Sequence, residues 1–159
     1  MKKNNVKGYR IIFGILTAVV MVCIFLFSCE DSDKSSDTSG RIVKIILRIF
    51  YEDFENMSLA EQEEIRSRIS HIIRKTAHFT IYAALGFFSS LTVGQRKLIS
   101  MSTAGVILFC FGYAVTDEIH QYFVPGRACM VTDMLLDTCG GITGMLISFV
   151  CMKIFLKRK

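Results

Sequence analysis

Charged residues divide this sequence into segments that alternate with apolar runs. Ten of its lysines and arginines lie in three short stretches before, between and after apolar runs, with no acidic residue among them. All fourteen acidic residues lie with the other nine bases in residues 30–75 and 117–137. The positive-inside rule predicts that the three basic stretches are cytoplasmic. The basic residues are Lys2, Lys3, Lys7, Arg10, Arg96, Lys97, Lys153, Lys157, Arg158 and Lys159.

Four apolar segments are each near the roughly 20 residues that cross about 30 Å of hydrocarbon as a helix. They cover about residues 9–28, 76–93, 98–116 and 134–156. We interpret them as helices, because an unclosed strand would leave backbone polar groups unpaired in lipid. We therefore predict an all-α membrane protein with one domain, residues 1–159. It is a small bundle of four transmembrane helices in the plasma membrane, with both termini cytoplasmic.

Composition excludes an ordinary soluble domain. The 159 residues are 52% hydrophobic, with a mean hydropathy of +0.44, one proline and no tryptophan. Orientation in the membrane explains the net charge of +5, so we expect no nucleic-acid partner.

The first span has an alternative interpretation. Its basic start, its apolar run and the sequence Leu26-Phe27-Ser28-Cys29 resemble a lipoprotein signal with Cys29 acylated. Phe27 argues against cleavage there, since a small or β-branched residue is usual at that position. Cleavage would leave three spans and an outer N-terminus. Cys29 and Cys129 are the two cysteines expected outside, where a disulfide between them is an open alternative.

The segment from 29 to 75 is an outer loop with parts of its own. Residues 30–40 are acidic and serine-rich, so we expect them to be mobile or tethered only by side-chain hydrogen bonds. Residues 41–55 alternate charged and apolar positions at helical spacing, which predicts an amphipathic helix. It would either lie in the outer membrane interface or cap the bundle.

A second helix is expected to begin in this loop. Ser58 and Glu61 have the spacing of a capping box. The apolar stripe that follows could continue directly into the second span; it consists of Ile65, Ile69 and Ile72.

Polar residues gather at the outer ends of the last three spans. Lys75, His78 and Tyr82 share one face of a helix. Asp117, Glu118 and Gln121 precede a Pro125-Gly126 turn that presents Arg127, and Asp133 and Asp137 are one helical turn apart. We interpret these nine side chains as ligand-binding residues: Lys75, His78, Tyr82, Asp117, Glu118, Gln121, Arg127, Asp133 and Asp137.

The free-energy cost of placing charged side chains in a membrane suggests that these residues form one site. A charge at the centre of a membrane helix costs about 2.5–3.5 kcal/mol, and such residues normally face a bundle interior or a wet cavity. We expect His78 and Asp137 to be the most buried, in a polar, water-accessible pocket under the outer surface. Gly140 and Gly144 have GxxxG spacing, which would let a neighbouring helix approach closely.

Several of these residues also have structural interpretations. Lys75 could extend to lipid headgroups, and Arg127 could pair with Asp117 or Glu118. His78 could hydrogen-bond a carbonyl group between helices. We interpret His120 as structural or lipid-interfacial, and we assign His71 no role.

The ordered motifs RKTAHFTIYAALG, DEIHQYFVPGR and D-x3-D-x2-G-x3-G resemble the VanZ-like family of integral membrane proteins. The segment after the first span, FSCEDSDKSSDTS, is similar to the serine-rich FSSQ-type segment of that family, so the resemblance covers roughly residues 27–144. Three positions depart from the pattern: Cys29 and Glu30 replace Ser and Gln, and Asp137 replaces a common Asn.

The resemblance implies an envelope role in Gram-positive bacteria. The member that gave the family its name confers low-level resistance to teicoplanin, a lipid-tailed glycopeptide, without altering the peptidoglycan stem terminus. Our leading hypothesis is a non-enzymatic protein whose outer pocket binds the headgroup of a lipid or lipid-tailed compound. Lys75 and Arg127 would contact the anion. The sequence leaves self-association open.

The alternative is a membrane-embedded enzyme that modifies an envelope lipid or glycopeptide. His78, Asp117 and Glu118 are the candidates for acid–base catalysis. No motif places a nucleophile, and no CxxC or HExxH spacing is present, so we expect no metal and no cofactor. A proton-coupled transporter fits less well, because all the charged groups of the pocket lie on one side of the membrane.

Overall fold

The computed structural model describes residues 3–29, 32–51, 53–94, 97–125 and 127–157. The described part of the chain is helical throughout, as predicted, with short connections and no strand. The helices are α1 (Lys3–Ser28), α2 (Ser32–Phe50), α3 (Leu59–Val93), α4 (Met101–Gln121) and α5 (Val131–Lys157), and a 3-10 turn, η1, spans Phe54–Asn56.

Three of the described helices are long and apolar enough to cross a membrane, rather than the four that we predicted. They are the segments Gly8–Ser28 in α1, Met101–Gln121 in α4 and Val131–Ile154 in α5. The predicted second span is the last half of α3, where serine, threonine, histidine and tyrosine dilute the apolar residues. Buried Ser89 and Ser90 show that these polar groups face neighbouring helices.

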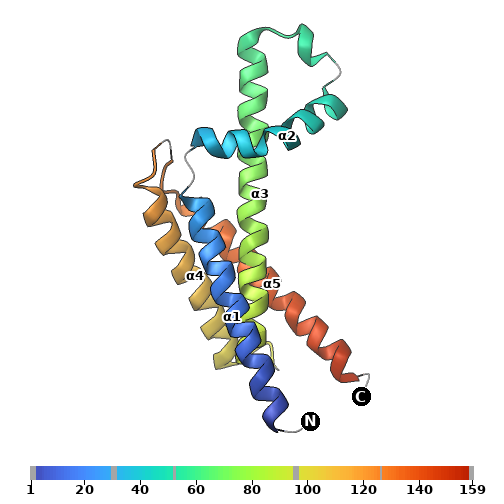
Figure 1. Ribbon diagram of the computed structural model, residues 1–159, viewed down its shortest axis with the longest axis vertical. Helices are drawn as coiled ribbons and strands as arrows, with labels where there is room; N and C mark the ends of the chain where they lie inside the picture. The colour runs from blue at the N-terminus through green and yellow to red at the C-terminus, as the bar shows by residue number, and fades with distance from the viewer. Residues whose placement is uncertain (1–2, 30–31, 52, 95–96, 126, 158–159) are drawn as a thin grey trace.

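Helix α3 is the central element of the molecule, as Figure 1 shows. Its 35 residues correspond to about 50 Å at 1.5 Å per residue, well beyond the roughly 30 Å of a bilayer core. The predicted capping box is confirmed: Glu61 N donates to Ser58 Oγ, and Ser58 N donates to Glu61 Oε2. Hydrogen bonds from the Ser58 hydroxyl and amide groups lower the pKa of Glu61. The helix ends at Gly94, which adopts a left-handed conformation with φ 66°.

The loop before α3 is more ordered than we predicted. Residues 32–40 belong to α2 instead of forming a mobile segment, and residues 30, 31 and 52 lie outside the described residues. Helix α2 crosses α3 in Figure 1 and packs Val43 and Leu47 against Ile69 and Phe54. The predicted stripe on α3 is only partly correct, because Ile72 is exposed.

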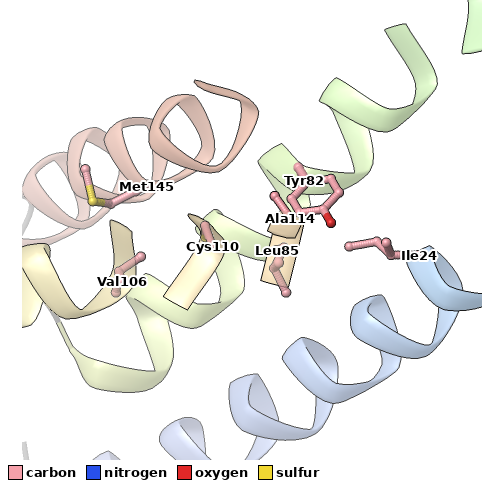
Figure 2. Packing of buried hydrophobic residues seen from close by; sticks show 7 residues of the cluster. All are labelled: Ile24, Tyr82, Leu85, Val106, Cys110, Ala114 and Met145. Carbon is pink, nitrogen blue, oxygen red and sulfur yellow. The ribbon is translucent and has the colours of Figure 1, made fainter. Parts of the chain in front are cut away.

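The hydrophobic core lies between α1, α3, α4 and α5. Figure 2 shows its seven buried side chains: Ile24, Tyr82, Leu85, Val106, Cys110, Ala114 and Met145. The outer surfaces of α1, α4 and α5 expose apolar side chains such as Ile15, Leu108 and Val150, as helices in contact with lipid do. All six cysteines are free, so a Cys29–Cys129 disulfide does not form.

Helices α3 and α5 make the most extensive interface in the bundle. Glycine makes it possible: a Cβ atom on Gly144 would overlap the carbonyl oxygen of Ala83, and one on Gly140 would overlap that of Phe79. Gly86 of α3 meets the backbone of Gly141 in the same way. The close approach predicted from the GxxxG spacing is therefore confirmed.

We predict that Gly144→Ala destabilises the bundle by about 1–3 kcal/mol or more, because the added methyl group must separate two backbones. Thermal unfolding in detergent, followed by circular dichroism, measures the loss. Gly112→Ala is the matched control: it lies in α4 with nothing within 4 Å of its added Cβ. It should leave stability unchanged or raise it by up to about 1 kcal/mol. Equal effects of the two substitutions would contradict the packing account.

Candidate functional site

A polar cavity of about 220 Å³ lies where α3, α4, α5 and the α4–α5 connection meet. In Figure 1 this connection is at the end of the bundle opposite the chain termini. We call it the polar cavity. Its lining residues are His71, Arg74, Lys75, His78, Glu118, Gln121, Arg127, Ala128, Met130, Asp133, Leu136 and Asp137.

Three helices bring ionisable side chains together at the inner wall of this cavity or directly behind it. His78 Nδ1 of α3 lies 3.9 Å from Asp117 Oδ2 of α4 and 3.8 Å from Asp137 Oδ2 of α5. The residues Asp117 and Asp137 are 5% and 1% exposed. The prediction that His78 and Asp137 are the most buried is correct for Asp137 only, because the His78 side chain is 13% exposed and Asp117 and Glu118 are more buried.

Asp137 has an unusual environment for a carboxylate. Both of its oxygen atoms are buried, and neither has a hydrogen-bond partner among the residues that the structure describes. Burial of a charged group is costly unless it is paired and hydrogen-bonded. The protein therefore retains a buried acid whose hydrogen-bonding capacity is not used by its own side chains.

Gln121 connects the site to the end of α1. Its Nε2 atom donates to Asp117 Oδ2 over 3.2 Å and to Ser28 Oγ over 3.4 Å. Arg127 Nη1 donates to Gln121 Oε1 over 3.2 Å, and Arg127 Nη2 donates to the carbonyl oxygen of Phe27. This network holds Asp117 just behind the cavity lining and ties the α4–α5 connection to α1 and α4.

The connection itself closes with a turn. The amide of Arg127 donates to the carbonyl of Val124, the bond that defines a β-turn, and Gly126 lies outside the described residues. Glu118 is 1% exposed and accepts a hydrogen bond of 2.9 Å from the amide of Met130. The carboxylate thus sits beside the N-terminus of α5, where negative charge is favourable.

Lys75 and Asp133 form an ion pair across the mouth of the cavity, with side chains that are 30% and 23% exposed. Lys75 therefore has a partner on α5 as well as a place in the cavity lining. The pair joins α3 to the first turn of α5.

The nine predicted residues are not all equivalent in the structure. Seven line the cavity, whereas Tyr82 lies in the hydrophobic core and Asp117 lies behind the lining. His120 is outside the site: its ring lies 4.7 Å from that of Phe25, in keeping with a structural role.

Two ionisable residues of the cavity were missed from the sequence. His71 and Arg74 lie on the turn of α3 before Lys75, and both line the cavity. The available signal was periodicity, since Arg74 is four residues before His78 and His71 four residues before Lys75. The spacing places these residues on the cavity only if α3 continues outward as one unbroken helix.

The model of the VanZ/LLP1 family matches residues 13–153, nearly the whole chain. The chain belongs to the VanZ/LLP1 family. The match spans α2 and all the helices that form the cavity. No curated protein and no solved structure matches the chain significantly. Family membership agrees with the resemblance seen in the sequence and supports an envelope protein with membrane-spanning helices.

We predict a coupling free energy of about 1 kcal/mol between Lys75 and Asp133 in a double-mutant cycle of Lys75→Gln and Asp133→Asn, because the pair is partly shielded from water. Unfolding free energies in detergent measure it. The exposed Arg68–Glu64 pair on the same helix is the control, with expected coupling of about 0.3–0.5 kcal/mol. Coupling of Lys75 to Asp133 below that of the control pair would show that the ion pair does not join α3 to α5.

Proposed function

We propose that this VanZ/LLP1 protein is a multi-pass protein of the plasma membrane, with four spans and both termini in the cytoplasm. Residues 76–93 of α3 provide the fourth span. Ser89 and Ser90 of this segment are buried, and Ser148 Oγ of α5 donates a 2.7 Å hydrogen bond to Ser90 Oγ. The exposed Thr76 and Thr80 donate to carbonyl groups of α3 itself. The start of α1 and the end of α5 lie at one end of the bundle in Figure 1, and the basic stretches of the sequence flank them.

In this orientation α2 lies at the outer membrane surface. It packs one apolar stripe against α3 and leaves a second exposed, formed by Ile42, Ile45, Ile49 and Phe50. An exposed apolar stripe on an amphipathic helix suits the headgroup region of a bilayer. The polar cavity then opens to the outside, just above the hydrocarbon.

The orientation predicts which cysteines can be labelled from outside. In a variant that retains only Cys129, a membrane-impermeant maleimide should label intact cells, because Cys129 is exposed beside the cavity. In a cysteine-free background, Lys153→Cys at the opposite end should react only after the membrane is permeabilised. The reverse pattern would overturn the proposed orientation.

We further propose that the polar cavity binds the anionic headgroup of a membrane lipid or lipid-tailed compound, without catalysis. The observation that carries the proposal is Arg74, a partly buried cavity residue with no ion-pair partner among the residues described. Arg127 lines the same cavity, and guanidinium groups bind phosphate or carboxylate with two parallel hydrogen bonds. Exposed Val131 and Leu135 of α5 lie nearby to contact an acyl tail.

Teicoplanin fits this ligand class, since it carries an acyl tail and acts at the outer membrane face. Binding of its headgroup or of a competing lipid would give the low-level resistance associated with the name-giving family member. A deletion strain should then become more sensitive to lipidated than to non-lipidated glycopeptides. Equal changes in sensitivity to both would remove tail recognition from the proposal.

We predict that Arg74→Gln and Arg127→Lys each weaken binding of phosphatidylglycerol about tenfold, because hydrogen bonds to charged groups contribute about 1.5–3 kcal/mol. Native mass spectrometry of the full chain in detergent, with phosphatidylglycerol and then teicoplanin as probes, measures the affinities. Arg68→Gln is the matched control, because Arg68 is exposed on α3 and pairs with Glu64. Equal losses in all three variants would indicate a nonspecific charge effect and would contradict the proposal.

A membrane-embedded enzyme is the second candidate function. It is favoured by the position of His78 between two buried carboxylates on the cavity wall. Such an arrangement is suited to acid–base catalysis. Turnover of a lipid-linked substrate that is abolished by His78→Asn would place this function ahead of binding alone.

A further inference from the structure

Three helices each deliver one potential metal ligand to a single point. The ligand atoms of His78, Asp117 and Asp137 all lie within 4.8 Å of one another. They come from α3, α4 and α5, and each side chain is held by the packing of its helix rather than by a loop. Ligands on rigid elements are a feature of built metal sites.

The unused hydrogen-bonding capacity of Asp137 points to the same place. Its two oxygen atoms are buried and have no hydrogen-bond partner within the described part of the chain. His78 Nδ1 is 3.8 Å from Asp137 Oδ2, beyond the 2.7–3.2 Å of an N–H···O hydrogen bond. The histidine therefore does not satisfy this carboxylate.

The net charge of this cluster favours a bound cation. With both carboxylates ionised, Asp117, Asp137 and His78 carry a net charge of −2 when the imidazole is neutral and −1 when it is protonated. Gln121 donates to Asp117 but brings no charge. Buried charges are normally paired or coordinate metals. A divalent ion would neutralise both carboxylates and leave the imidazole neutral, as a metal ligand must be.

We propose that His78, Asp117 and Asp137 form a binding site for a divalent transition-metal ion such as Zn²⁺. An imidazole in the ligand set favours Zn²⁺ over the Mg²⁺ and Ca²⁺ that all-oxygen sites prefer. Ligands at about 2.0–2.2 Å in a tetrahedron are about 3.4 Å apart. The two distances from His78 Nδ1, 3.8 and 3.9 Å, need to shorten by about half an ångström. All three ligand atoms lie within 4.8 Å of one another, so the two carboxylate oxygens need to approach by at most about 1.4 Å, which side-chain rotation can provide.

The remaining coordination position faces the polar cavity. His78 and Asp137 line the cavity while Asp117 lies behind them, so a fourth ligand comes from the cavity side. This ligand is water or an anionic oxygen of a bound molecule, the open arrangement found in sites with three protein ligands. The inference that an anionic headgroup takes that position rests on the function proposed above. The metal site itself does not depend on that function.

Metal binding to the purified full chain tests the site directly. After removal of the affinity tag and of metal with a chelator, titration with Zn²⁺ and mass-spectrometric metal analysis should show one tightly bound ion per chain. His78→Asn, Asp117→Asn and Asp137→Asn should each weaken binding more than about 100-fold, because loss of even an outer partner costs about 10–100-fold. His120→Asn is the matched control, since His120 lies outside the cavity, and it should bind as the unaltered protein does.

Thermal unfolding provides a second test that remains informative if a variant folds poorly. Zn²⁺ should raise the Tm of the unaltered protein and leave that of Asp137→Asn unchanged. Without metal, Asp137→Asn should raise the Tm, because it removes a buried charge that lacks a partner. Undetectable Zn²⁺ binding, or equal binding by Asp137→Asn, would overturn the metal site. No lipid is present in these measurements, so their failure is distinct from failure of headgroup binding.

Discussion

Close backbone contact between α3 and α5 brings together the functional groups that these two helices contribute to the polar cavity. Gly140 and Gly144 allow α5 to press against the carbonyl groups of Phe79 and Ala83. Asp137 is one turn before Gly140, and His78 is next to Phe79, so the same contact places the acid beside the histidine. A wider separation of the two helices would move His78 and Asp137 apart and open the inner wall of the polar cavity.

Buried charge is the cost that this arrangement carries. Asp117, Glu118 and Asp137 are nearly inaccessible at the end of apolar helices, where charged side chains are expensive. Glu118 is compensated by the N-terminus of α5, and Asp117 by Gln121. Asp137 has no hydrogen-bond partner among the residues that the structure describes, and His78 Nδ1 lies 3.8 Å away; the metal ion that we propose would supply the missing compensation.

Much of the fold and most of the cavity could be predicted from the sequence. Apolar runs and segregated charges predict the helices, and the GxxxG spacing predicts that α5 is closely approached by a neighbouring helix, because these features depend on local pattern. That the neighbour is α3 is known only from the structure. The helix over residues 32–40 was not predictable, since its polar composition favours disorder in isolation. Residues 76–93 are not apolar enough to count as a span by composition, and their polar groups fit a membrane only where neighbouring helices cover them, which the sequence alone does not show.

The site shows the same division between local pattern and tertiary structure. Seven of the nine predicted residues line the cavity, but Arg74 and His71 were missed because their role requires α3 to extend outward as one helix. No sequence motif indicated a metal, because the three potential ligands come from separate helices and have no characteristic spacing. Convergence of His78, Asp117 and Asp137 is a property of the packed bundle.

Dipolar recoupling by solid-state NMR tests this convergence most directly. The protein would be reconstituted in bilayers with ¹⁵N-labelled histidine and ¹³C-labelled aspartate. The account predicts transfer from the His78 ring to carboxyl carbons of both Asp117 and Asp137, and Asp137→Asn should remove one of the two signals. A spectrum in which the His78 ring contacts neither carboxylate would contradict the account.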